Sequence, residues 1–171
     1  MRKIVIIIGS KSDLPQCRAG LQYLKTCGSA QVVGVYVRSQ HRNTLETQEL
    51  LKKLSQEEID VAIIGAGWAN HLTGCCDAFL RYTLQNTRIV VIGVAFADPE
   101  NEKHTQAAAL SMSEVPGTKV KYEDDRGVFV GLDGFARACI VATEKLPEIT
   151  LPSPKEPLDL TLTEALQIAA E

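Results

Sequence analysis

The sequence predicts an α/β domain in which a parallel sheet carries helices on both faces. Short runs rich in β-branched residues, such as 3–8 and 60–64, are apolar at nearly every position, as strands covered on both faces are. Segments with apolar residues at helical spacing follow these runs. Strand and helix patterns alternate along the chain, which is typical of parallel strands joined by crossover helices.

The expected elements follow one another in a regular order. Strands are predicted at 3–8, 31–37, 60–64 and 88–95, and helices from residue 12 or 13 to about 28 and at 44–56, 74–84 and 102–113. Ser12 or Asp13 suits the start of the first helix, and Asn43 with Glu46 resembles a capping signal for the second.

The last strand is harder to place. Both 118–122 and 128–130 have strand character, and the residues between them, 124–127, read as a turn. A fifth helix is expected over 135–146. Five parallel strands in this order suit a flavodoxin-like, three-layer α/β/α domain spanning residues 1–146.

The C-terminal segment, 147–171, differs from the domain. Its prolines, Pro147, Pro152, Pro154 and Pro157, predict an extended arm. Thr161 and Glu164 then form a capping box before a short amphipathic helix. This helix either folds back on its own domain or docks on a neighbouring subunit, and the length of the arm favours the neighbour.

Bulk composition excludes several classes of protein. The chain has 171 residues, 45% of them hydrophobic, and a net charge of −3. Without a basic run, we expect no nucleic acid or membrane partner. The apolar run 4–8 is too short for a membrane span or a signal peptide, so we expect a cytoplasmic protein.

The cysteines and histidines predict no metal site. The five cysteines are odd in number and include no C-x-x-C pair, so we interpret them as small core residues rather than disulfides or ligands. The three histidines lie in separate segments, and no ligand spacing links them.

Three loops that follow strands carry the polar chemistry, and the carboxyl ends of parallel strands meet at one edge of a sheet. In the first loop, Gly9 permits a turn, while Ser10, Ser12 and a helix start suit a phosphate. Asp13 can accept hydrogen bonds from ribose hydroxyls. The alternative for Ser12 and Asp13 is simple helix capping.

The second and third loops add a proton donor and a glycine-rich backbone. Ser39, His41 and Arg42 follow the second strand, where an arginine can bind phosphate and a histidine can exchange protons near neutral pH. The third loop runs from Gly65 to Gly74, and its glycines allow a ligand close to the main chain. His71 in this loop contacts a ligand or serves local structure, with neither reading favoured.

These loops resemble the signature loops of the PurE family of purine-biosynthesis enzymes. The matching residues are Gly9-Ser10-Lys11-Ser12-Asp13, then Ser39-x-His41-Arg42, then Gly65-Ala66-Gly67-x-Ala69-x-His71-Leu72-x-Gly74. Their order and spacing match, and the resemblance covers roughly residues 4–142. The third loop is similar to that of the N5-carboxyaminoimidazole ribonucleotide mutases rather than the animal carboxylases.

The resemblance implies a flavodoxin-like subunit in a homo-octamer, with sites at subunit junctions and with neither a metal nor an organic cofactor. The substrates would be an aminoimidazole ribonucleotide and CO₂. His41 would move the proton. The resemblance implies the following binding residues: Ser10, Ser12, Ser39 and Arg42 for the phosphate, Asp13 for the ribose, and Gly65, Ala66, Gly67, Trp68, His71 and Leu72 for the ring and its carboxylate.

Several positions depart from the family pattern. Trp68 stands where the family has glycine, Asn70 where it has alanine, and Thr73 where it has proline. Gln40 replaces an alanine, and the family's Leu-Asn-Gly-x-Asp-Ser run is missing from 98–115. A tryptophan in the ring-binding loop could fill the pocket or stack on a larger base.

Three functions therefore stay open on the sequence. The first is the mutase, or the related carboxylase. The second is a relative that carboxylates or decarboxylates another heterocyclic ribonucleotide, which Trp68 and Asn70 favour. The third is a nucleotide-binding module without catalysis.

Overall fold

The computed structural model describes residues 1–170 and places four parallel strands at its centre. The strands are β1 (Arg2–Ile8), β2 (Ala30–Val37), β3 (Val61–Ala66) and β4 (Val90–Ala95), in the order β2-β1-β3-β4. The helices are α1 (Leu14–Thr26), α2 (Thr44–Gln56), α3 (His71–Ala78), α4 (Glu102–Ser113), α5 (Gly131–Val141) and α6 (Leu162–Ile168). A 3₁₀ turn, η1 (Lys11–Asp13), precedes α1, and a π-helical turn, η2 (Phe79–Thr83), extends α3.

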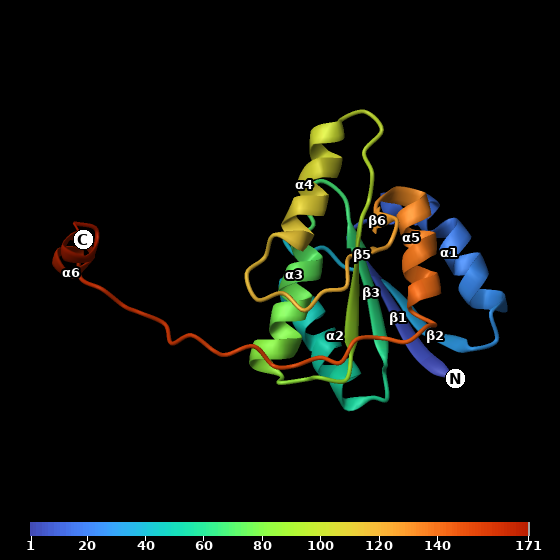
Figure 1. The fold of residues 1–171 in the computed structure, drawn as a ribbon, viewed down its shortest axis with the longest axis horizontal. Helices are drawn as coiled ribbons and strands as arrows, with labels where there is room; N and C mark the ends of the chain where they lie inside the picture. Colours follow the sequence, from blue (N-terminus) through green and yellow to red (C-terminus); the bar gives the residue numbers. More distant parts are fainter. Residues whose placement is uncertain (171) are drawn as a thin grey trace.

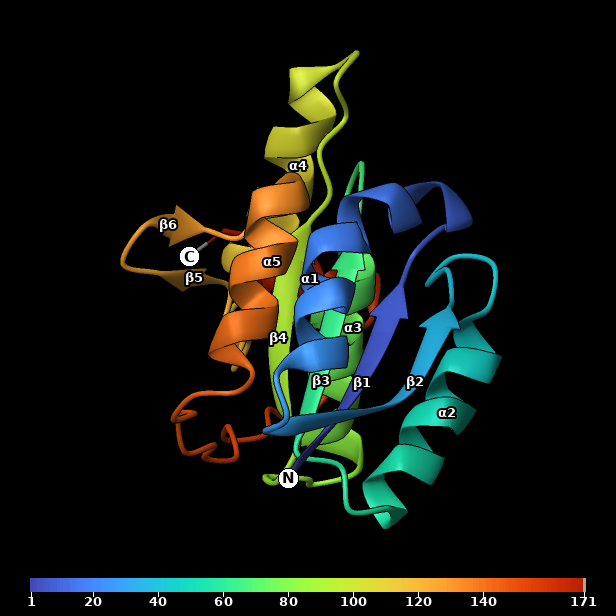
Figure 2. The ribbon, with the colours of Figure 1, turned by 90° about the vertical axis from the view of Figure 1, so that its right-hand side faces the viewer.

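The helices form two layers around the sheet. Helices α1 and α5 cover one face, and α2, α3 and α4 cover the other (Figures 1 and 2). In β1, Ile4, Ile6 and Ile8 pack toward α1 and α5, while Val5 and Ile7 pack toward the opposite layer. Both faces of β1 are therefore buried, which explains why its sequence is apolar without alternation.

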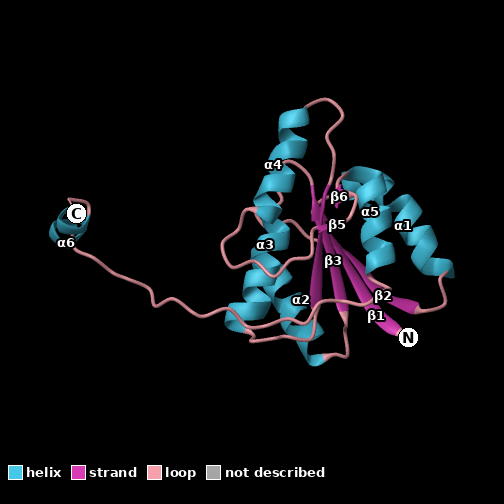
Figure 3. Ribbon diagram, viewed as in Figure 1, coloured by secondary structure: helices cyan, strands magenta, loops and turns pink. Residues whose placement is uncertain are grey.

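The predicted five-stranded sheet is wrong, because the structure has four regular parallel strands. Lys121 and Val130 each form one isolated parallel bridge with β4, so both candidate segments lie along its free edge. Between them the chain leaves the sheet as a small hairpin, β5 (Glu123–Asp124) and β6 (Gly127–Val128). This insertion breaks the hydrogen-bond register that one strand would need, which leaves four regular strands (Figure 3).

The predicted helices are present, but some of them begin at other residues than predicted. Helices α2 and α4 have the predicted bounds. Helix α3 begins at His71 rather than Gly74, because the Asn70 side chain accepts the Thr73 N–H and caps the helix earlier. Asn43 precedes α2 but makes no side-chain cap; its amide oxygen instead accepts the Ser39 N–H at 3.2 Å.

The C-terminal segment follows α5, which ends at Val141 rather than near residue 146, and Leu146 and Ile149 still pack against the core. Residues 145–160 form neither helix nor strand, and α6 lies apart from the domain (Figure 1). The predicted capping box is present, since the Thr161 hydroxyl accepts the Glu164 N–H and the Glu164 carboxylate accepts the Thr161 N–H. Among the described residues, no helix is both long and apolar enough to cross a membrane.

Candidate functional site

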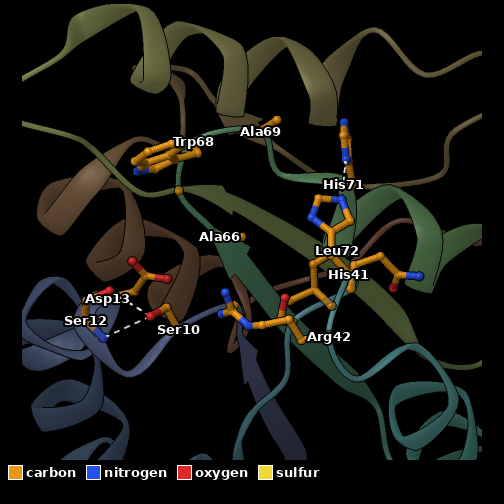
Figure 4. Close-up of a pocket in the computed structure, with 14 residues that line it drawn as sticks. Ser10, Ser12, Asp13, His41, Arg42, Ala66, Trp68, Ala69, His71 and Leu72 are labelled. Carbon is orange, nitrogen blue, oxygen red and sulfur yellow. Dashed lines mark hydrogen bonds between the residues drawn. The ribbon is translucent and has the colours of Figure 1, made fainter.

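A cavity of about 470 Å³ lies at the carboxyl ends of β1, β2 and β3, where the three polar loops meet (Figure 4). Its lining consists of Gly9, Ser10, Ser12, Asp13, Ser39, Gln40, His41, Arg42, Ala66, Gly67, Trp68, Ala69, His71 and Leu72. Each predicted loop contributes to this lining, as the topology of a parallel sheet requires.

The first loop places two hydroxyls and one carboxylate in the cavity. Ser10 Oγ accepts hydrogen bonds from the Ser12 hydroxyl at 2.8 Å and from the Ser12 N–H at 3.3 Å. Asp13 precedes α1 but its side chain does not cap the helix. Simple capping of α1 therefore does not explain Ser12 or Asp13, which leaves their polar atoms available to a ligand.

Asp13 lies in a partly desolvated environment. Burial raises the pKa of its carboxyl, and a hydrogen bond from the Ser10 backbone opposes that rise. A side chain that is costly to ionise in the free protein is typical of a binding site, since a ligand can supply the missing hydrogen bonds.

The second loop brings His41 against His71 of the third. His41 Nε2 and His71 Nδ1 are 3.1 Å apart, and the rings meet edge to face. Only one of two hydrogen-bonded ring nitrogens carries the hydrogen between them, so the pair shares a proton. In Figure 4 Arg42 points across the cavity toward the Ser10 side. The loop thus offers a proton-exchanging group and a cation at the same cavity.

The third loop exposes backbone at Gly67. A side chain built there would come within 3.5 Å of the Phe96 carbonyl oxygen and 3.8 Å of Asp13 Oδ1. The first and third loops are therefore in close contact. Gly65 is the exception among the predicted site residues: it lies inside β3, where a β-carbon would meet the Phe96 ring at 2.8 Å. Packing rather than ligand contact explains this glycine.

His71 is the first residue of α3, but the capping function belongs to Asn70. The Asn70 amide also donates to the Val94 carbonyl at 2.9 Å, while the Thr73 hydroxyl lies 2.9 Å from the Asn70 amide oxygen and 3.1 Å from the Ile64 carbonyl. Asn70 and Thr73 are both buried. These two departures from the family pattern thus form one structural network, and the His71 side chain is left to the cavity.

Trp68 and the altered segment after β4 also form one unit. The Trp68 indole stacks on His104 of α4, with ring centroids 4.1 Å apart and planes 18° from parallel. His104 Nδ1 lies 2.7 Å from Asp98 Oδ2, and this hydrogen bond lowers the pKa of the Asp98 carboxyl. Trp68 has φ of 61°, the left-handed region that favours glycine. The backbone therefore keeps the conformation that the family's glycine suits, while the side chain is new.

The sequence identified most of this lining. Every predicted site residue except Gly65 lies on the cavity, whereas Gly9, Gln40 and Ala69 also line it and were not predicted. Gly9 directly precedes Ser10, and the other two lie between predicted residues, so position was the available clue. His104 was also missed, because nothing in its helical surroundings indicates a partner in the third loop.

Four of the five cysteine thiols are harder to ionise than a free thiol. Burial raises the pKa of Cys17 to about 12 and raises the pKa of Cys76 and Cys139 further. Cys75 is exposed as a residue, but its thiol is partly buried, and this burial also raises the pKa of the thiol. Within residues 1–170, no cluster of three or more histidine, cysteine or acidic side chains could hold a metal ion.

A family model and several known proteins are similar to this chain. A family model described as AIR carboxylase matches residues 3–144. The N5-carboxyaminoimidazole ribonucleotide mutase of Pyrococcus abyssi is 33% identical over 156 residues, which cover 87% of this chain and 78% of the relative. The protein of the same name from Saccharolobus solfataricus is 31% identical over 119 residues, covering 68% of this chain and 66% of the relative. A crystal structure of PurE from Treponema denticola has a TM-score of 0.56 at 16% identity, covering 84% of this chain and 87% of that one, and at that identity it supports the fold alone.

Proposed function

This chain belongs to the AIR carboxylase family, and we propose that it is a purine-biosynthesis enzyme that moves a carboxyl group on aminoimidazole ribonucleotide. The curated relatives are named as mutases, which favours isomerisation of the N5-carboxyamino compound to the carbon-carboxylated one. The related carboxylase activity, a lyase reaction, is the alternative within the family.

The reaction needs one proton delivered and one removed. The carbamate on the exocyclic nitrogen loses CO₂ as that nitrogen gains a proton, and the ring carbon then attacks the CO₂. The resulting tetrahedral carbon loses its proton. His41 is suited to both proton steps, because its ring is hydrogen-bonded to the His71 ring. His71 can hold one proton while His41 delivers or accepts another. CO₂ must stay in the cavity between the steps.

The other lining residues suit the parts of a ribonucleotide. We assign the phosphate to Ser10, Ser12, Ser39 and Arg42, and the ribose to Asp13, as the family resemblance implies, and all five residues line the cavity. Ala66, Gly67, His71 and Leu72 would border the ring and its carboxylate. Backbone N–H groups at the start of α3 favour a developing negative charge there.

One observation carries the proposal: His41 lies in the same cavity as Ser12 and Gly67, which come from the other two loops. The test follows the ultraviolet spectrum of N5-carboxyaminoimidazole ribonucleotide with wild type and with His41→Asn. We expect turnover by wild type and a loss of roughly 100- to 10,000-fold in the variant. Binding of ribose 5-phosphate should be unchanged, which controls for folding. Folded wild-type protein without turnover would contradict the proposal.

Trp68 favours a second candidate, a reaction on a different heterocyclic ribonucleotide. Its indole lies on the cavity where the family pattern has only hydrogen. A thermal-shift screen of ribonucleotides distinguishes the two, since this candidate predicts a larger shift with another base than with aminoimidazole. Exchange of labelled CO₂ into substrate by wild type would exclude a module without catalysis.

We further propose that the protein assembles, with the homo-octamer as the expected state and the arm 147–171 docked on a neighbouring subunit. Support comes from α6, which has no buried residue in the isolated chain although Leu162, Leu166 and Ile168 are apolar. A cytoplasmic location stays a prediction that fits a biosynthetic role.

A further inference from the structure

The Trp68 side chain is held by two independent devices. The first is its backbone, whose left-handed conformation, with φ of 61°, is strained for a residue with a β-carbon. The second is the parallel stack on His104. A strained backbone conformation persists only where the surrounding structure holds it in place, and such residues gather at functional sites. The strain at Trp68 therefore suggests that the indole has a functional role.

His104 is fixed in turn by groups from its own loop and helix. Asn101 Oδ1 accepts the Lys103 N–H at 3.1 Å as the cap of α4, so Asn101 Nδ2 faces His104 Nε2 at 3.2 Å. Nε2 must therefore accept, and the hydrogen lies on Nδ1, where it is donated to Asp98. This single tautomer satisfies both ring nitrogens and orients the ring under the indole.

The opposite face of the indole is open. Trp68 is 66% exposed even though His104 covers one of its faces, and the residue lines the cavity with Asp13 and Gly67. In Figure 4 the indole lies on the Asp13 side of the cavity, across from His71, so a ring between them can contact both. A ligand whose sugar reaches Asp13 brings its base into the region that the indole borders.

We propose that Trp68, with His104, Asp98 and Asn101 behind it, forms a stacking wall that recognises the flat heteroaromatic ring of the ribonucleotide. Trp68 contacts the ring, and the other three are positioning residues. The inference rests on the proposed function for the class of substrate. Stacking acts similarly before and during the reaction, so this wall sets affinity and ring choice rather than the rate of the chemical step.

The first test uses the emission of Trp68, the only tryptophan in the chain. Wild type is titrated with ribose 5-phosphate and, separately, with aminoimidazole ribonucleotide, which adds only the ring. We expect the ring to change the indole emission and the sugar phosphate to leave it nearly constant. An equal response to both ligands, or to neither while both bind, would overturn the proposal.

The second test separates affinity from rate. Trp68→Ala and Trp68→Gly both remove the indole, but glycine also relieves the left-handed strain, so one of the pair folds even if the other does not. We expect KM to rise about tenfold in both with kcat nearly unchanged, and Trp68→Phe to retain most of the affinity. His104→Ala should raise KM less, and His104→Phe, which restores a flat ring, should recover it. Unchanged KM in the Trp68 variants would refute the wall.

The two proposals fail separately. An emission change without turnover contradicts the carboxyl-transfer reaction and keeps the stacking wall. Normal turnover with an unresponsive indole contradicts the wall and keeps the reaction.

Discussion

At the scale of single residues, Asp13 shows a conflict between stability and binding. Burial raises the pKa of its carboxyl above the ordinary 3.8, so ionisation is less favourable in the folded state than in the unfolded one. The folded protein therefore carries a cost above the folded pKa, and this cost disappears as the pH falls below the unfolded value. We predict that Asp13→Asn stabilises the free protein at pH 7, by on the order of 0.5 kcal/mol because solvent screens the half-exposed group.

The same substitution should weaken binding of ribose 5-phosphate about tenfold, since a charged acceptor is lost. Urea unfolding at pH 7 and pH 3.5 measures the first effect, and a thermal-shift titration measures the second. Ser12→Ala is the matched control for the stability measurement, because it removes a polar lining group without removing a partly buried charge. A variant less stable than wild type at pH 7 would show that the Ser10–Asp13 hydrogen bond outweighs desolvation.

The sequence predicted the residues that line the cavity better than it predicted the stack of Trp68 on His104. Ser12, His41 and Gly67 were brought together by one rule, that loops at the carboxyl ends of parallel strands share an edge. The stack of Trp68 on His104 follows from no such rule. It depends on a backbone angle at Trp68 and on the rotation of α4, and neither leaves a pattern in the sequence.

At the scale of elements, a buried ion pair ties η2 to the sheet. Arg81 Nε donates to Asp77 Oδ1 at 3.0 Å, and the two residues are 1% and 2% exposed. Arg81 also donates to the Ile89 carbonyl just before β4, while Asp77 Oδ2 accepts the Lys119 N–H. Burial lowers the pKa of the guanidinium and Asp77 opposes that shift, so the carboxylate offsets part of the cost of burying the Arg81 charge.

We predict that Asp77→Asn lowers the free energy of unfolding by about 3–5 kcal/mol, because it leaves the Arg81 charge buried and uncompensated. Arg81→Met should cost a similar amount, and the double variant should lose clearly less than the sum. Urea unfolding of all four proteins gives the coupling energy. Additive losses would mean that the hydrogen bonds of Arg81 to the backbone, and not the ion pair, dominate.

Prediction of elements succeeded where local and tertiary preferences agree. Helices α2 and α4 begin and end as their patterns indicate. The fifth strand failed because its two segments look equivalent in sequence, and only the β5–β6 hairpin decides that neither continues into the other. Helix α3 begins earlier than expected because the Asn70–Thr73 network is a tertiary contact with β4 as well as a cap.

At the scale of the whole molecule, two apolar surfaces are exposed within the described residues, 1–170. One is the row of Val33, Val35 and Val37 on the edge strand β2, and the other is the apolar side of α6. Exposed apolar groups that gather on one element are typical of interfaces. An unpaired edge strand is also open to association, so an assembly that covers both surfaces fits this chain better than a free monomer does.

The proposed docking of α6 gives a prediction with an internal control. Leu162→Asp/Leu166→Asp places two charges on the apolar side of α6. Burial of each leucine on docking would stabilise the assembly by about 1.5–3 kcal/mol. Thr163→Asp/Gln167→Asp adds the same charge at the same spacing, one residue further along the helix. We expect light scattering to give an assembly for wild type and for the control, and smaller species for the leucine variant. The two variants should differ in assembly state because burying a charge opposes docking, whereas adding a charge that stays exposed does not. If both variants keep the wild-type mass, α6 does not hold the subunits together. If wild type is itself a monomer, the assembly proposal fails. Any site built at a subunit junction then fails with it.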